Sequence, residues 1–451
     1  MAGQITISAK NIIGNASGTI QDDAKTIKNI AGGKFTQNGK KGVNNDKNEE
    51  RKPVKTGTTQ VKTIERITKL DLGSKNDKSG TTQEGMVFGK NYSFKVTEYT
   101  NGDPIDKSKI KWMIKYHSPE LSKNKWVEIP STITGENYTI FVNEKDMCGR
   151  FVYIRAYIND AKTEGELKVW KHNRFRWFDR EILEQEIKER TDDKKPWLVN
   201  QAGTSLCGMA CIFYLFAKEQ PESYKKFAKE LFRTGEAKHN EYKAKPSIEV
   251  LERKINSKKL VENTGGMPLV DYVTMAGTRN TDNPDYKGGD EQVQAINWPW
   301  VVNNLSKKLL GYKNIIDKGT KNFINGSTGL INVENKLNEL ENLYKQNYKI
   351  ILMVDSDLIQ DRFDFDSADY HWVVYEGGLN ISAPNYRIKK YFEDLIIFDL
   401  FSWGSNPKDK NPLILNSKTK KLERNPEQGY LNKKISISHF NTNFYGYIAC
   451  K

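Results

Sequence analysis

Three residues of this chain could together carry out thiol chemistry: Gln201, Cys207 and His371. Cys207 opens an apolar run to Lys218 that predicts a helix, and a Cys at a helix N-terminus has its thiolate stabilised by the helix dipole and free backbone N–H groups. His371 opens the apolar run to Tyr375, which predicts a strand that can hold an imidazole against the sulfur. Gln201 lies six residues before Cys207, where its amide could donate to an oxyanion. The pattern predicts a thiol nucleophile, its base and an oxyanion donor.

These motifs resemble those of the papain-like cysteine peptidases. Gln-x5-Cys-Gly, a distant His before apolar residues and a late Asp occur in the order of that family. Cys-Gly-Met-Ala-Cys at 207–211 and His-Trp-Val-Val at 371–374 are most similar to the bacterial bacteriocin-processing branch. The resemblance covers roughly residues 195–451. It implies Cys207 as nucleophile, His371 as base and Gln201 as oxyanion donor.

The third catalytic residue departs from the family pattern. Papain-like peptidases place Asn directly before Ser-Trp-Gly, and this chain has Phe401 there. Asp399 ends the apolar run that begins at Leu395, so it is expected at a strand end. We expect Asp399 to orient His371, as in the bacteriocin-processing branch, although a strand-end Asp is as often a cap or turn residue.

Four further residues are candidates for substrate binding. Gly203 and Gly208 would allow close approach of a substrate to the backbone. Trp372 and Trp403 would wall the site, and such large aromatic residues are equally typical of an ordinary core.

The loop before His371 is rich in carboxylates. Six aspartates lie between Asp355 and Asp369, which could select a basic peptide, bind Ca²⁺ or form a solvated acidic loop. Their spacing does not fit an EF-hand, and no Cys/His pairing has metal-ligand spacing. We therefore expect no metal and no cofactor.

Composition limits the class of protein. The 451 residues suffice for two or three domains, and the net charge is +14. The excess of lysine is spread along the chain, which favours a solvated surface over a nucleic-acid or anionic cell-wall partner. Four cysteines are too few for a disulfide framework. No apolar run of about 18 residues and no signal peptide are predicted.

The pattern along the chain predicts a multidomain protein. Residues 1–43 read as a short β-rich leader, and 44–82 as a polar linker with one strand near Ile64–Leu72. Residues 83–177 alternate with period two, which predicts an all-β, immunoglobulin-like sandwich. Residues 178–451 show helical and then strand patterns, which predict an α+β domain, papain-like by the resemblance.

The leader resembles N-terminal segments of cargo and spike-associated proteins of bacterial contractile (type VI-like) injection systems; a flexible polar leader is the alternative. Together these features predict a cysteine-dependent hydrolase of peptide bonds in a protein or peptide substrate. We expect it to be made in the bacterial cytoplasm and exported without a cleavable signal peptide, as an effector toxin. Spike or tube proteins, bound through residues 1–43, and an immunity protein are the further partners this deployment implies. The alternatives are a peptidoglycan amidase or glutamine deamidase on the same fold, and an inactive structural component or adhesin.

Overall fold

The computed structural model describes residues 59–75, 78–119, 125–254, 266–289, 291–320, 333–360, 370–382, 395–403, 413–415, 422–424 and 431–451. These all belong to one compact unit, Thr58–Lys451. The expected leader, residues 1–43, lies outside the described residues.

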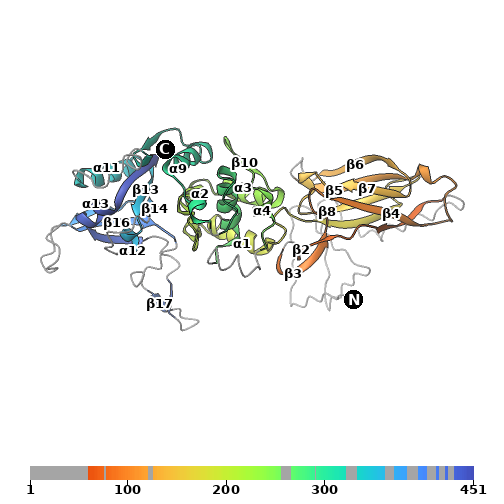
Figure 1. Ribbon diagram of the computed structural model, residues 1–451, viewed down its shortest axis with the longest axis horizontal. Helices are drawn as coiled ribbons and strands as arrows, with labels where there is room; N and C mark the ends of the chain where they lie inside the picture. The colour runs from red at the N-terminus through yellow and green to blue at the C-terminus, as the bar shows by residue number, and fades with distance from the viewer. Residues whose placement is uncertain are drawn as a thin grey trace, which may run out of the picture. The chain divides into compact units, whose positions relative to one another are not determined.

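The N-terminal part of this unit is a β module of two main sheets (Figure 1). One sheet has the order β1-β4-β7 and the other β6-β5-β8-β9, all antiparallel. Apolar residues at every second position of β4, β5 and β8 form one core between them, which includes Phe94, Trp112 and Ile154. The strands are β1 Val61–Arg66, β4 Asn91–Tyr99, β5 Lys111–Ser118, β6 Lys125–Thr134, β7 Asn137–Phe141, β8 Arg150–Tyr157 and β9 Gly165–Lys171.

This module begins earlier in the chain than expected. β1 pairs with β4 and buries Val61 and Ile64 in the module core, and β2 (Asp71–Lys75) pairs with β3 (Lys78–Gly85). The linker predicted over residues 44–82 therefore ends before Val61. The one strand expected near Ile64–Leu72 overlaps β1, but its place in the module was not predicted, because β1 buries only two side chains.

A group of helices follows. Asp179 caps α1 by accepting from the N–H groups of Glu181 and Ile182, and Gly235 ends α3 with a left-handed φ of 72°. Helix α2 is buried from Cys207 to Ala217 because other elements pack around it. The helices are α1 Arg180–Arg190, α2 Cys207–Glu219, α3 Pro221–Thr234, α4 Ile248–Leu251, α6 Leu269–Asp271, a π-helix Tyr272–Ala276, α7 Gly277–Asp282, α8 Gln292–Ala295, α9 Pro299–Lys308 and α11 Val333–Lys345, with a β10–β11 hairpin (Ala237–His239, Tyr242–Ala244).

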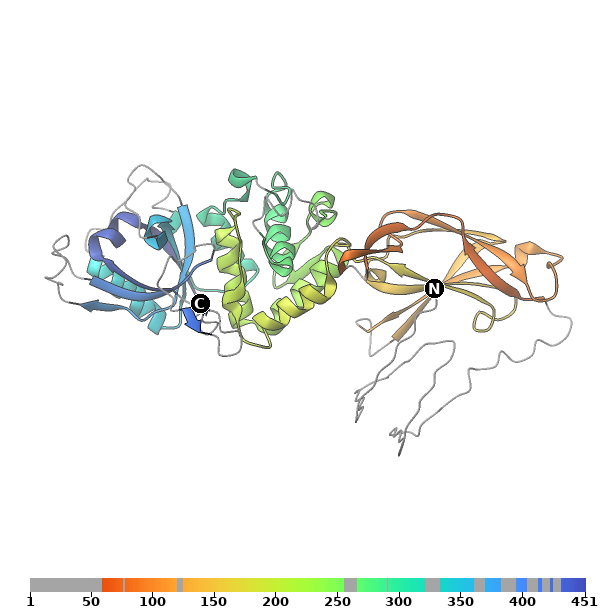
Figure 2. The same ribbon diagram turned by 90° about the horizontal axis from the view of Figure 1, so that it is seen from below.

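The C-terminal part is an antiparallel sheet, whose strands run from cyan to blue in Figure 2. Its order is β12-β20-β13-β14-β16-β15, with β19 also paired to β16. The strands are β12 Ile315–Asp317, β13 Lys349–Asp355, β14 Tyr370–Tyr375, β15 Asn380–Ser382, β16 Leu395–Phe401, β19 Leu431–Ser436 and β20 Phe444–Cys450; the remaining elements are α12 Asp357–Gln360, α13 Ile437–Asn443 and the pair β17 Leu413–Leu415 and β18 Leu422–Arg424.

Both faces of this sheet are buried. Met353, Trp372 and Val374 point into the core that contains α2, whereas Val373 and Tyr375 point into a second core with residues of α11 and α13. The two cores explain why β13 and β14 read as continuous apolar runs. The chain thus combines β-sheet and helical parts. Among the described residues, no helix has the length and apolar character needed to cross a bilayer.

Candidate active site

Cys207 is the first residue of α2, as the sequence predicted, and only 7% of it is exposed. The backbone N–H groups of Cys207, Gly208 and Trp372 act to lower the pKa of its thiol. These donors favour the thiolate, but burial away from water acts against it more strongly and raises the pKa of the thiol to about 11. The site therefore holds a neutral thiol.

His371 is the second residue of β14 and is half-buried. Burial lowers the pKa of its imidazole to about 4, so the ring is neutral near pH 7. Its Nε2 lies 3.4 Å from the Oγ of Ser402, and its ring centroid lies 5.7 Å from that of Trp403. The site thus contains a neutral thiol and a neutral imidazole, although a stabilised thiolate was expected, because desolvation opposes charge on both groups.

The backbone links these two residues. Helix α2, which begins with Cys207, packs against β14, and Trp372, whose N–H acts to lower the pKa of the thiol, directly follows His371 in that strand. The sulfur therefore lies beside the start of the strand that carries the imidazole. Helix α2 begins at the predicted residue, and β14 begins one residue before the predicted start.

The structure does not bring Asp399 to His371. Glu376 donates its N–H to the carbonyl of Asp399, and Asp399 donates its own to Gly377, each at 2.8 Å. Asp399 therefore lies opposite the far end of β14, five residues or roughly 16 Å from His371 along the strand. Asp399 also does not end its strand, because β16 continues to Phe401, and the register places it too far along β14 to orient the imidazole.

Because of the register between β14 and β16, Ser402 and not Asp399 lies near His371. Val374 pairs with Phe401, so the residues just after Phe401 approach the start of β14. Phe401, at the family's Asn position, stacks its ring on Tyr214 of α2 with centroids 3.8 Å apart. Phe401 therefore serves packing, and the neighbouring hydroxyl faces the imidazole.

Asn297 is a site residue that the sequence did not indicate. Its Oδ1 accepts from the N–H of Met209 at 3.1 Å, in the first turn of α2, and its carbonyl accepts from the Nε1 of Trp372 at 2.8 Å. One residue thus joins the nucleophile helix to the histidine strand. No local motif signals this role, because the two partners lie 88 and 75 residues away.

Gln201 lies in a loop held by a chain of hydrogen bonds. Asp271 accepts from the N–H of Asn200 at 2.9 Å, and the Asn200 side chain accepts from the N–H of Ala202 at 2.7 Å. Ala202 has a φ of 52°, in the left-handed region that non-glycine residues rarely adopt. The Gln201 side chain is buried, and its Oε1 has no hydrogen-bond partner in the part of the chain that the structure describes. The loop is thus held in place, and the buried amide oxygen of Gln201 accepts no hydrogen bond from the described residues.

A buried ion pair anchors this loop. Asp271 and the guanidinium of Arg190 lie 2.6 Å apart, with side chains 0% and 2% exposed. The same Nη2 of Arg190 donates to the carbonyl of Leu198, at 2.9 Å. Asp271 therefore fixes the loop from one side and Arg190 from the other.

The predicted binding residues have different surroundings. A Cβ on Gly208 would lie 2.5 Å from the Cβ of Asn297, so this glycine makes room for Asn297 and not for a substrate. Trp372 is 2% exposed and belongs to the core. Gly203 is exposed in the Gln201 loop, and Trp403 lies beside the imidazole of His371.

No group of three or more metal-ligating side chains lies together among the described residues. Of the acidic loop, only Asp355 and Asp357 are described. Both are buried, and Asp355 accepts from Tyr445 Oη at 2.7 Å; Asp361, Asp364, Asp366 and Asp369 lie outside the described residues. All four cysteines are unpaired and buried.

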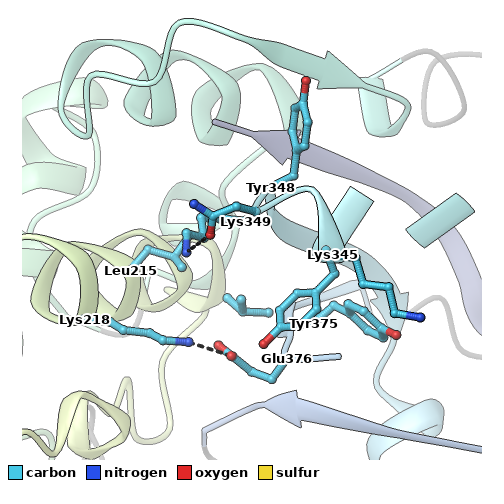
Figure 3. Close-up of a pocket in the computed structure, with 10 residues that line it drawn as sticks. Leu215, Lys218, Lys345, Tyr348, Lys349, Tyr375 and Glu376 are labelled. Carbon is cyan, nitrogen blue, oxygen red and sulfur yellow. Dashed lines mark hydrogen bonds and ion pairs between the residues drawn. The ribbon is translucent and has the colours of Figure 1, made fainter. Parts of the chain in front are cut away.

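A pocket of about 200 Å³ lies at the C-terminal ends of α2 and β14, whereas Cys207 and His371 lie at the N-terminal ends of these elements (Figure 3). Lys218 of α2 and Glu376, just after β14, form an ion pair of 2.6 Å at its wall. Lys218 lies eleven residues, or roughly 16 Å of helix, from Cys207. The pocket is therefore separate from the thiol.

Neither models of known protein families nor curated proteins match this chain.

Proposed function

We propose that this chain is a cysteine-dependent hydrolase of amide bonds, with Cys207 as nucleophile and His371 as base. One observation supports this most directly. Cys207 begins a buried helix that packs against β14, and the N–H of the residue that follows His371 acts to lower the pKa of its thiol. An ordinary core cysteine, such as Cys211 one turn later, needs no such environment.

The proposed reaction starts from two neutral groups. As the sulfur attacks the carbonyl carbon, its proton moves to the Nδ1 of His371, because Nε2 faces Ser402. The negative charge that develops on the carbonyl oxygen is stabilised by the side chain of Gln201 and the N–H of Cys207.

His371 then gives the proton to the leaving amine, and the C–N bond breaks to leave a thioester on Cys207. His371 next removes a proton from a water molecule, which attacks the thioester. The acid product leaves, and the proton returns to the sulfur. Ser402 holds the imidazole in place throughout and takes the role that we expected of Asp399.

We extend the proposal to the fold of each part of the chain and to the cell in which the protein acts. We propose a papain-like arrangement for residues 178–451 and an immunoglobulin-like one for the β module. We also propose that the protein is an exported effector that acts on a protein or peptide of another cell, with an immunity protein and spike or tube proteins as partners. The resemblance of residues 1–43 supports this deployment.

The test compares Cys207→Ala with Cys211→Ala. Both remove a buried sulfur from α2, so they differ only in the proposed role. Each is incubated with a denatured protein, with purified peptidoglycan and with a glutamine-containing peptide, and products are identified by mass spectrometry. Peptide-bond cleavage by the wild type and Cys211→Ala, but not by Cys207→Ala, supports the proposal.

Release of peptidoglycan stem peptides, or a mass gain of one on glutamine, would instead assign the amidase or the deamidase. The inactive structural component is a real second candidate, because the thiol and imidazole are both neutral and Asp399 is remote from them. Absence of any product dependent on Cys207 would favour it.

A further inference from the structure

A row of four aromatic rings crosses the sheet β6-β5-β8-β9 of the β module. Trp126 lies opposite His117, and Phe151 lies opposite Trp170. Tyr116 pairs with Val152, so the next residues along, His117 and Phe151, continue the line from β5 to β8. Ring centroids are 5.2 Å apart for Trp126 and His117, and 5.1 Å apart for Phe151 and Trp170. We call these four residues the aromatic row.

The aromatic row lies on the outer face of the sheet. The neighbours of these residues along the strands, Tyr116 and Val152, point into the module core, and side chains alternate between faces. Trp126 is 44% exposed and Phe151 is 43% exposed. The outer face of such a sheet is usually polar, so a row with two exposed rings and two half-buried ones marks an interaction surface.

A second row of side chains runs parallel to the first. It contains Glu128, Lys115, Tyr153 and Lys168, one from each strand. The Lys115 ammonium lies 4.6 Å from the centre of the Trp126 ring, and that of Lys168 lies 4.4 Å from the Phe151 ring. Each of the two most exposed rings therefore has a lysine ammonium, a hydrogen-bond donor, over one face.

Charges on this face are largely paired. Arg155 contacts Glu166 at 2.5 Å, and Lys115 contacts Glu128 at 3.7 Å. A surface for single-stranded nucleic acid combines stacking rings with an unopposed positive groove, which the carboxylates here interrupt. A polyhydroxylated ligand uses donors and acceptors of both signs, and its ring faces pack on aromatic side chains.

We propose that the aromatic row and its parallel row bind an oligosaccharide. Sugar rings would pack on Trp126 and Phe151, which lie two strand spacings, or roughly 9.6 Å, apart. Their hydroxyl groups would bond Lys115, Lys168 and the carboxylate of Glu128. This proposal does not depend on the chemistry of Cys207.

The test uses the full chain and three variants. Trp126→Ala and Phe151→Ala remove the exposed rings, and Phe141→Ala is the matched control, because Phe141 is 53% exposed on β7 of the other sheet. Binding is measured by calorimetry with β-1,4-linked hexasaccharides of glucose and of N-acetylglucosamine, and by sedimentation with insoluble peptidoglycan. Thermal unfolding of each variant checks that it is folded.

We expect the wild type and Phe141→Ala to bind at least one of these glycans alike. Trp126→Ala and Phe151→Ala should each weaken glycan binding about tenfold or more. Absence of binding to every glycan, or equal binding by all variants, would overturn the proposal. So would binding of a single-stranded oligonucleotide that is lost with Trp126, since the ligand would then be a nucleic acid.

Discussion

The backbone N–H of Trp372 acts on the thiol of Cys207 and lowers its pKa, and the helix that Cys207 begins packs against the strand that carries His371. This N–H and the two other backbone donors favour a thiolate, yet the site is too well buried to hold one at rest. The balance of these effects decides how the sulfur reacts.

We expect Cys207 to be alkylated slowly near neutral pH. With a thiol pKa of about 11, only about one sulfur in ten thousand is ionised at pH 7, and the thiolate is the reactive form. Labelling by iodoacetamide, mapped by mass spectrometry, should remain slower than that of a free cysteine until the pH approaches 11. Fast labelling at pH 6 that is lost in His371→Ala would show instead that the ion pair exists at rest.

We expect the free energy of unfolding to fall as the pH is lowered from 6.5 to 4. Burial lowers the pKa of His371 to about 4, so in this range the unfolded chain binds a proton that the folded chain does not. The loss is at most about 3 kcal/mol, because the imidazole keeps some exposure. Urea unfolding at pH 4.5 and pH 7 measures it. His371→Gln should reduce the difference, and an unchanged difference would contradict the assignment.

Ser402→Ala should lower kcat/KM about tenfold, the equivalent of one hydrogen bond to the imidazole. Asp399→Asn is the matched comparison and should change kcat/KM less than twofold, because the carboxylate lies at the far end of β14. Both are measured on the substrate found for the wild type. A large loss with Asp399→Asn alone would restore the family's arrangement of the triad.

Gly208→Ala should lower the free energy of unfolding by about 1–3 kcal/mol. The new methyl group would lie 2.5 Å from the Cβ of Asn297, and overpacking of this kind forces neighbours to shift. Gly203→Ala, in the exposed part of the preceding loop, should stay within about 0.5 kcal/mol of wild type. Chemical denaturation of both variants provides the measurement, and equal stability would argue against the close packing of Asn297.

Asp271→Asn should lower the free energy of unfolding by about 3–5 kcal/mol, because it leaves the buried guanidinium of Arg190 unpaired. The control is Asp192→Asn, which removes a solvent-exposed pair with Lys225 and should leave the urea midpoint nearly unchanged. If both variants unfold at the same urea concentration, the buried pair does not anchor the loop as described.

The helices and strands near the site could be predicted because their apolar runs are long and uninterrupted. The expected helix from Cys207 to Lys218 is observed as Cys207–Glu219, and the expected strand from His371 begins one residue earlier. Only one strand, near Ile64–Leu72, was expected where β1–β3 lie, because the many polar residues of this segment are typical of a linker.

The contacts within the site were less predictable. Asp399 was expected at a strand end, but β16 continues to Phe401, and the distance of Asp399 from His371 depends on the register between β14 and β16, which local sequence does not encode. Ser402 could have been found by aligning the two strands on Val374 and Phe401. Asn297 and Asp271 act through partners more than 70 residues away, so no spacing rule reveals them.

The separation of Cys207, Asn297 and Trp372 along the chain also affects synthesis. The last N–H that acts on the thiol, that of Trp372, follows the nucleophile by 165 residues, which a ribosome adds in roughly 10–30 s. During that interval Cys207 belongs to a nascent chain that has neither its base nor the environment of the folded site. In the cell that makes this protein, Cys207 therefore reaches its folded environment only after translation has passed Trp372.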